Sequence, residues 1–162
     1  MPVETLILRG GRVVCPLNGI DKVVDVVVQD GLVLAIGDTN IDGHVVDCSG
    51  LVVSPGFIDI GAELCDPGLT WREDIGSGSE AGAAGGFTTI VASSKTDPVI
   101  DTPTAVAEVV GRSMEATGAR ILVAGALTTR LDCEHMAELG LMIEAGAVAL
   151  SDGRKPMMNT GL

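Results

Sequence analysis

The chain has 162 residues, of which 46% are hydrophobic, so it is long and apolar enough for a domain with a buried core. Its formal net charge is −12, from 10 basic and 22 acidic residues. An acidic surface of this size argues against nucleic acid as a partner and favours a basic protein surface. Aromatic residues make up 2% of the chain, which removes the stacking platforms that bases need.

The four cysteines have no paired spacing, which indicates reduced thiols rather than a disulfide framework. Every long apolar stretch is interrupted by a charge or a glycine cluster, so no membrane helix is expected. The start of the chain lacks the basic region of a secretion signal. We therefore expect a cytoplasmic protein that does not contact a membrane.

The first 54 residues are expected to form a small antiparallel β module. Residues 5–14 and 23–36 are rich in β-branched and apolar side chains, which favours strands. The Gln29-Asp30-Gly31 break within the second run predicts a hairpin turn. Residues 45–53 add further short strands around Ser49-Gly50.

From Pro55 onward the sequence predicts strands that alternate with helices. Such alternation implies parallel strands covered by helices. A polar loop is expected after the first strand, over residues 65–72, and a helix of small residues follows it up to Gly85-Gly86. The four predicted strands are residues 57–60, 87–92, 120–124 and 147–150, and the first helix covers about residues 73–84.

Capping residues predict the ends of the second and third helices. Thr102-Pro103 supplies an N-cap and a proline at the first helical position, and Gly118 is the expected C-cap. Asp132 is expected to cap the third helix, with a hydrophobic staple between Leu131 and Met136, and Gly146 to end it. The apolar face of the second helix is predicted to consist of Val106, Val109, Val110 and Met114.

Residues 55–68 have the sequence PGFIDIGAELCDPG. This segment resembles the signature P-G-x-I-D-x-H-x-H-x-R-x-P-G of amidohydrolases of the dihydroorotase type. Gly61 and Glu63 stand where that signature has two metal-binding histidines, and Cys65 stands where it has arginine. The frame of the signature is kept, but its metal-binding histidines are replaced.

The resemblance extends from about residue 5 to residue 160. Residues 85–90 (GGFTTI), 125–128 (GALT) and 144–153 (EAGAVALSDG) are similar to segments of the same family, in the same order. Lys95 replaces the asparagine that would bind substrate in the family. The family has an acidic residue or a modified lysine that helps to hold the metal near residue 152, so Asp152 is the one candidate metal ligand that remains.

The resemblance implies an α/β fold in two parts. Residues 1–54 would form the small β module of the family, and residues 55–162 would form about the first four β/α units of a metal-dependent-hydrolase-type (β/α)8 TIM barrel. A whole barrel typically takes about 250 residues. We expect the chain to be the N-terminal part of a longer protein, although a truncated chain that depends on association, or a degraded gene fragment, stays an alternative.

Residues at the end of the first barrel strand are poorly suited to hold a metal. Gly61, Glu63 and Cys65 would share one face of the strand, because alternate residues of a strand point the same way. Gly61 has no side chain, and a hydrolytic zinc site usually has three protein ligands. We therefore expect no metal and no catalytic residue, with Gly61, Glu63 and Asp152 as degenerate metal positions and Cys65 and Lys95 as degenerate substrate positions.

Other candidate residues favour ordinary structural roles. His44 lies in the predicted β module and His135 in the first turn of a predicted helix, so neither is expected at a barrel strand end. Trp71 is expected to cover the mouth of the barrel. Arg72 and Lys95 could together attract an anion there.

Two functions remain open. The family includes dihydroorotase-like chains without a metal site that are structural partners of aspartate carbamoyltransferase. The resemblance thus implies a non-catalytic assembly subunit in pyrimidine biosynthesis, acting as part of an oligomer. The alternative is an active cyclic amidohydrolase of the dihydroorotase or hydantoinase type, which would need zinc and would use Glu63 and Asp152 as ligands.

Overall fold

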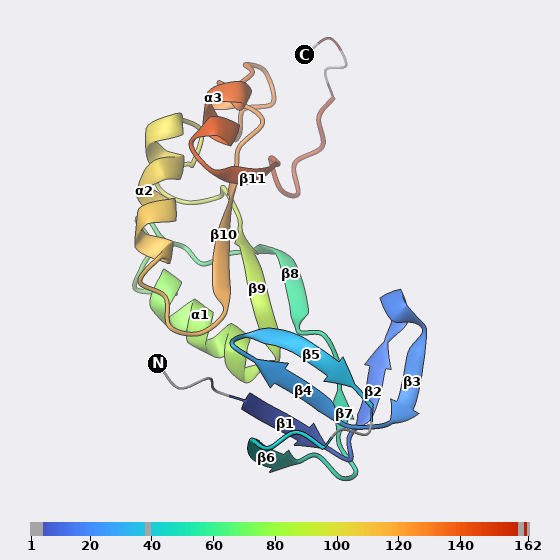
Figure 1. Ribbon diagram of the computed structural model, residues 1–162. Helices are drawn as coiled ribbons and strands as arrows, with labels where there is room; N and C mark the ends of the chain where they lie inside the picture. The colour runs from blue at the N-terminus through green and yellow to red at the C-terminus, as the bar shows by residue number, and fades with distance from the viewer. Residues whose placement is uncertain (1–4, 38–39, 159–160, 162) are drawn as a thin grey trace. The chain divides into compact units, whose positions relative to one another are not determined.

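A computed structural model of the protein describes residues 5–37, 40–158 and 161. The chain divides into two compact units, Met1–Pro55 and Gly56–Leu162. The described residues of the first unit form strands and one short 3-10 helix, whereas strands and helices alternate in the second unit (Figure 1). The change from one pattern to the other occurs beside Pro55-Gly56, where the sequence changes in character.

The N-terminal unit consists of two small sheets. The prediction of an antiparallel module was wrong in part, because β1 (Thr5–Arg9) pairs parallel with β6 (His44–Asp47) and β2 (Arg12–Cys15) pairs parallel with β7 (Val52–Val53). The physical reason is that β6 and β5 (Leu32–Ile36) lie on opposite edges of their sheet, so the chain crosses to the far side of β1 and enters β6 in the direction of β1. One sheet has the order β5, β4 (Val26–Gln29), β1 and β6, and the other has β3 (Ile20–Val23), β2 and β7.

The hairpin between β4 and β5 confirms the turn predicted at Gln29-Asp30-Gly31. The two strands pair antiparallel, with Gln29 opposite Leu32. Asp30 and Gly31 have φ angles of 50° and 77°, the left-handed backbone that a two-residue hairpin turn of type I′ requires.

The second unit contains a four-stranded parallel sheet in the order β11 (Ala147–Leu150), β10 (Arg120–Gly125), β9 (Phe87–Ala92) and β8 (Phe57–Ala62). Helices α1 (Ile75–Ala84), α2 (Pro103–Ser113) and α3 (Leu139–Glu144) pack on one face of it (Figure 1). The described residues form an open sheet and do not close a barrel, and none of their helices is long and apolar enough to cross a membrane. All four strands were predicted.

The core of the second unit lies between the sheet and the helices. Alternate residues of the strands, such as Ile121 and Val123 of β10, point toward the helices and are buried. Val106 and Val109 of α2 are fully buried against them, as their helical spacing predicted. Met114 does not belong to this face, because α2 ends at Ser113 and the Met114 side chain is 82% exposed.

Capping explains where the first two helices begin. The Asp74 carboxylate accepts a hydrogen bond from the Ser77 backbone N–H (2.8 Å), and this bond lowers the pKa of Asp74 below its usual value. The Thr102 hydroxyl accepts from the Ala105 N–H (3.3 Å), which confirms the predicted cap of α2.

Gly118 does not cap α2, so that prediction was wrong. Met114 is the C-cap, and Gly118 lies four residues beyond it. The Gly118 N–H donates to the Ser79 hydroxyl (3.0 Å), and this buried hydroxyl donates to the Ala119 carbonyl (2.9 Å). Glycine is needed at position 118 because the chain passes close to the α1 backbone on its way into β10.

The third helix begins later than predicted. Asp132 is not the N-cap of α3 but the C-cap of a short 3-10 helix, η2 (Thr129–Leu131), and its carboxylate accepts the backbone N–H groups of Glu134 (2.7 Å) and His135 (2.9 Å) in the loop that follows. Leu131 and Cys133 have φ angles of 57° and 62°, so the backbone cannot continue as a right-handed helix here. The staple between Leu131 and Met136 is therefore absent from the described helix α3, and His135 lies in the loop rather than in a helical turn.

Two glycine substitutions should have opposite effects on stability. A Cβ atom at Gly118 would overlap with the backbone of Ser79, so Gly118→Ala should lower the free energy of unfolding by about 1–3 kcal/mol. A Cβ atom at Gly111, inside α2, would meet nothing within 4 Å, so Gly111→Ala should raise it by about 0.5–1 kcal/mol. Urea unfolding would measure both changes. If both substitutions changed the free energy of unfolding in the same direction, the packing described for Gly118 would be contradicted.

The Asp132 loop should contribute a pH-dependent part of the stability. The N–H groups of Glu134 and His135, in that order, lower the pKa of Asp132. A lowered pKa in the folded state means that the stabilisation is present above the unfolded value of about 3.9 and is lost as the pH falls toward the folded value. The difference in unfolding free energy between the parent and Asp132→Ala should therefore shrink between about pH 6 and about pH 2. A difference that stays constant would contradict this.

Candidate functional site

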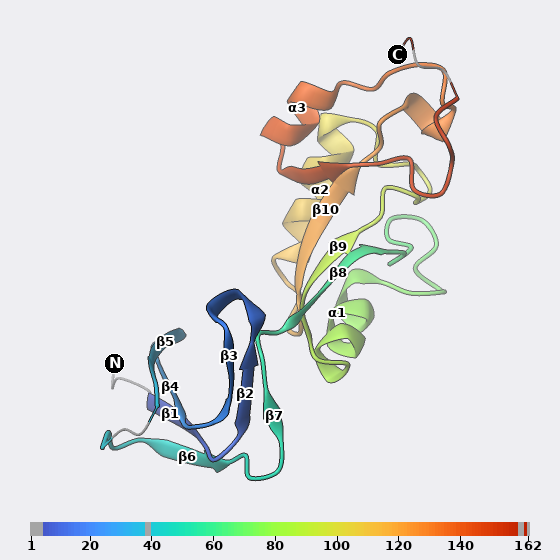
Figure 2. The same ribbon diagram turned by 90° about the vertical axis from the view of Figure 1, so that its right-hand side faces the viewer.

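The loops that follow the four parallel strands gather at one edge of the sheet in the second unit (Figure 2). They enclose an open cavity of about 980 Å³. Because parallel strands present all their carboxyl ends at the same edge, segments far apart in the sequence meet here. The ends of all four strands contribute to the lining, which includes Ile60 of β8, Val91 of β9, Ala124 of β10 and Ala149 of β11.

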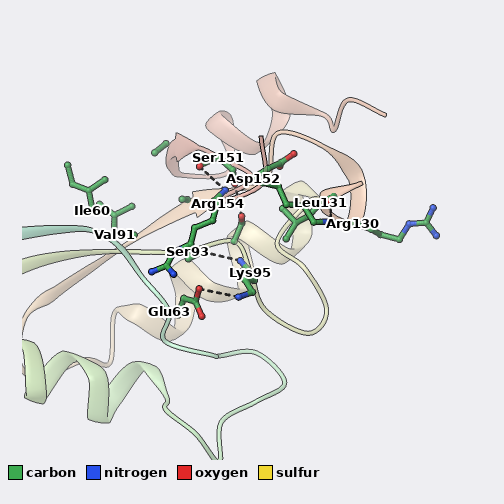
Figure 3. Close-up of a pocket in the computed structure, with 16 residues that line it drawn as sticks. Ile60, Glu63, Val91, Ser93, Lys95, Arg130, Leu131, Ser151, Asp152 and Arg154 are labelled. Carbon is green, nitrogen blue, oxygen red and sulfur yellow. Dashed lines mark hydrogen bonds and ion pairs between the residues drawn. The ribbon is translucent and has the colours of Figure 1, made fainter. Parts of the chain in front are cut away.

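Four of the five predicted site positions meet in this cavity. Gly61, Glu63, Lys95 and Asp152 all line it, and Figure 3 shows the last three side chains. Cys65 does not line it, so the prediction that Cys65 shares the face of Gly61 and Glu63 was wrong. The strand β8 ends at Ala62, and Cys65 has a φ angle of 59°, so the alternation of a strand no longer applies to its buried side chain.

An ion pair crosses the cavity between the ends of β8 and β9. The Lys95 Nζ atom lies 3.3 Å from the Glu63 Oε1 atom. Both side chains are largely accessible, so the free energy of the pair is small, in the range of about 0–1 kcal/mol. The pair nevertheless places a fixed positive charge beside the carboxylate that the sequence offered as a metal ligand.

The backbone at Gly61 does not suit a larger residue. Its φ angle is 117°, a conformation that residues with a side chain rarely adopt. Histidine at this position would therefore be strained, although a Cβ atom would meet nothing within 4 Å. Glycine, which stands here in place of the first histidine of the signature, is thus the residue that the local backbone favours.

Asp152 is buried and its carboxylate is fully engaged by the protein. The Oδ1 atom accepts the backbone N–H groups of Leu127 (2.8 Å) and Thr128 (3.0 Å), and the Oδ2 atom accepts the Thr128 hydroxyl (2.5 Å). The Thr128 hydroxyl in turn accepts the Cys133 N–H (2.9 Å). These bonds hold the loop after β10 against the end of β11.

The donor groups in the cavity do not fit a hydrolytic metal site. Glu63 is paired with a cation, Asp152 accepts four hydrogen bonds, the fourth of them from the Cys133 thiol (3.9 Å), and Gly61 has no side chain. Within the described residues, no group of three or more His, Cys, Asp or Glu side chains could hold a metal ion. His44 lies in β6 of the other unit and His135 lies outside the lining of the cavity, so neither supplies a ligand here.

Basic residues that were not predicted there line the cavity, whereas two residues predicted for its mouth do not line it. Trp71 is 81% exposed and has the Arg72 guanidinium 6.0 Å from its ring centre, and neither residue lines the cavity. The prediction that Arg72 joins Lys95 there was wrong. Arg154 and Lys155 line it instead, and the signal that could have identified them is their place directly after the last strand and Asp152.

Comparison with known proteins agrees with this architecture. The family model of dihydro-orotase-like proteins matches residues 50–162. The chain belongs to the dihydro-orotase-like family. It is 40% identical to a dihydroorotase of Citrifermentans bemidjiense over 160 residues, which is 97% of this chain and 38% of that protein. It is 38% identical to a putative dihydroorotase of Rhodopirellula baltica, of which it covers 36%. The chain therefore spans well under half the length of these curated relatives.

Solved structures are similar over most of this dihydro-orotase-like chain. The L-hydantoinase (dihydropyrimidinase) of Arthrobacter aurescens has a TM-score of 0.74 and 28% identity over 90% of this chain and 32% of that one. A D-hydantoinase gives a TM-score of 0.69 at 24% identity, with the same coverage, and this likeness concerns the fold alone. The predictions of an α/β fold and of a dihydroorotase-like protein are confirmed.

The two carboxylates of the cavity should differ in their contribution to stability. Asp152→Ala leaves buried N–H groups of Leu127 and Thr128 without their acceptor, so it should lower the free energy of unfolding by about 2–4 kcal/mol. Glu63→Ala removes one half of an accessible ion pair and should cost less than about 1 kcal/mol. Urea unfolding of both variants would measure this, with Asp152→Asn, which keeps one acceptor oxygen, as the matched control. Equal costs would contradict a structural role for Asp152.

Proposed function

We propose that this chain is a non-catalytic, dihydroorotase-like assembly subunit that acts in pyrimidine biosynthesis in the cytoplasm. The observation that carries the proposal is the Glu63–Lys95 ion pair. It lies at the end of β8, where the family signature has its metal-binding histidines. No cofactor is proposed, and no residue of the cavity is assigned a catalytic role.

The replacement of side chains at the cavity supports a loss of catalysis. A hydrolytic metal site needs about three protein ligands and an open position for water. Glycine at position 61 offers no ligand, and the ammonium group of Lys95 compensates the charge of Glu63 without a metal. The other acidic candidate, Asp152, is held by hydrogen bonds from the protein.

The proposed partner is the catalytic chain of aspartate carbamoyltransferase, with this chain as a structural subunit of an oligomer. The net charge of −12 would favour docking on a basic patch of that partner, because complementary charge speeds association and selects orientation. Such docking should weaken as the salt concentration rises, since salt screens exposed charges.

A second candidate is an active, zinc-dependent cyclic amidohydrolase. The name dihydroorotase of relatives that are up to 40% identical favours it. For this function, ligands beyond those in the described cavity would have to complete the metal site. Metal content is therefore the measurement that distinguishes the two functions most directly.

Elemental analysis after dialysis against trace zinc and manganese tests the proposal. The chain should retain less than about 0.1 metal per chain, because the described residues of the cavity do not offer three free metal ligands. It should also bind the transferase catalytic chain at micromolar concentration in size-exclusion chromatography, and more weakly at high salt.

Two results would contradict the proposal. One is about one metal or more per chain, together with hydrolysis of dihydroorotate or a hydantoin that Glu63→Ala abolishes. The other is a failure to associate with the transferase at micromolar concentration. The variant Glu73→Ala is the matched control for Glu63→Ala, since Glu73 lies beside the start of α1 and does not line the cavity.

A further inference from the structure

The chain exposes its one tryptophan. It contains only three aromatic residues, and two of them, Phe57 and Phe87, pack edge to face with ring centres 5.9 Å apart. The third, Trp71, is 81% exposed in the loop between β8 and α1. A tryptophan side chain has a large apolar surface, and in folded proteins it is on average well buried. An exposed indole ring is therefore a candidate for contact with another molecule.

The backbone around Trp71 is held by hydrogen bonds. The Leu69 N–H donates to the Cys65 carbonyl (2.9 Å), and the Arg72 N–H donates to the Leu69 carbonyl (2.9 Å). Trp71 therefore lies inside a closed turn, and α1 begins shortly after it at its cap, Asp74. Figure 2 shows this segment as a loop at the end of β8. An aromatic ring on a fixed backbone loses little conformational entropy when it binds.

Two neighbouring segments connect the loop to the rest of its unit. The Asp97 N–H, in the loop after β9, donates to the Pro67 carbonyl (3.2 Å). The Arg112 guanidinium of α2 forms an ion pair with the buried Asp66 carboxylate (Nη1 to Oδ1, 2.5 Å). A partly buried pair is screened by solvent less than an exposed one. The exposed ring is thus carried by a supported loop and not by a free chain segment.

Arg72 adds a cation beside the exposed ring. Its guanidinium carbon lies 6.0 Å from the ring centre of Trp71. In the part of the chain that the structure describes, Arg72 has no carboxylate oxygen within 4.0 Å. Tryptophan and arginine are among the residues most enriched at the energetic centres of protein interfaces. Neither residue lines the cavity at the strand ends, so this pair forms a separate surface feature.

From these observations we infer that Trp71 is the anchor by which this chain docks on its partner protein. The indole ring enters an apolar pocket of the partner, and Arg72 contacts a carboxylate at the rim of that pocket. This docking face rests on the proposed function, and it assigns the loop of residues 66–74 to the contact with the transferase catalytic chain. The net charge of −12 guides the approach of the partner, whereas Trp71 acts at contact. A second copy of the chain is a poorer occupant, because two surfaces of charge −12 repel each other.

The single tryptophan allows the contact to be measured directly. The full chain is labelled with 7-azatryptophan, which can be excited apart from the tryptophans of the transferase. In the isolated chain, acrylamide should quench the label nearly as strongly as it quenches free 7-azatryptophan, because the ring is exposed. Addition of the transferase catalytic chain should reduce this quenching several-fold and in a saturable manner, since a bound ring is covered.

Variants separate the anchor from exposed apolar surface in general. Trp71→Ala should weaken association with the transferase by about thirtyfold or more, as expected for a residue at the centre of an interface. Trp71→Phe, which keeps a ring, should lose less. Met114→Ala is the matched control, because Met114 is 82% exposed at the end of α2, and it should change the affinity less than about twofold. Trp71→Ala should unfold at the temperature of the parent, since an exposed ring contributes little to the core, so its loss of affinity cannot arise from misfolding.

Each of four results would contradict docking through Trp71. Weak quenching of the label in the isolated chain would mean that the ring is covered by the chain itself or by a second copy. An unchanged affinity of Trp71→Ala, or an equal loss in Trp71→Ala and Met114→Ala, would remove this docking face and leave the proposed function intact. A parent chain that does not associate with the transferase at all would contradict the proposed function and this docking face together.

Discussion

The buried carboxylate of Asp152 is the interaction on which the functional edge of the second unit depends. A carboxylate that is removed from water must be compensated, and here two backbone N–H groups and one hydroxyl do so. These bonds fix the loop that begins at Leu127 against the end of β11. They thereby set one wall of the cavity and the place at which Arg154 and Lys155 leave the sheet.

The cavity lies where its family has a metal site, but residues 61 and 63 are not the histidines of the family signature. The parallel sheet places the end of β8 beside the end of β9, and the ends of β10 and β11 follow on the same side of the cavity. Between the ends of β8 and β9, the ammonium group of Lys95 compensates the charge of the Glu63 carboxylate. The ion pair of Glu63 and Lys95 can form without disturbing the sheet, because the helices pack on the face of the strands and not on their ends.

Much of the second unit could be predicted from local sequence. The strand β9 coincides with its predicted range because its β-branched run is bounded by glycines and a polar turn, and α2 begins at its predicted cap. Gly118 and Asp132 were misassigned because each has a partner that the local sequence does not reveal. Gly118 contacts Ser79, thirty-nine residues away, and left-handed residues on both sides of Asp132 exclude an α-helix there.

The sequence by itself determined the family, the alternation of strands and helices, and the absence of histidine from positions 61 and 63. These properties depend on residue identity and short-range pattern. Only the tertiary structure decided that Lys95 pairs with Glu63, that Asp152 accepts hydrogen bonds from Leu127 and Thr128, that Cys65 lies outside the cavity, and that Arg154 lines it. These hydrogen bonds and ion pairs join residues that are 24 to 32 positions apart in the sequence. They depend on how the parallel strands are aligned with one another, and the local sequence of one strand does not determine that alignment.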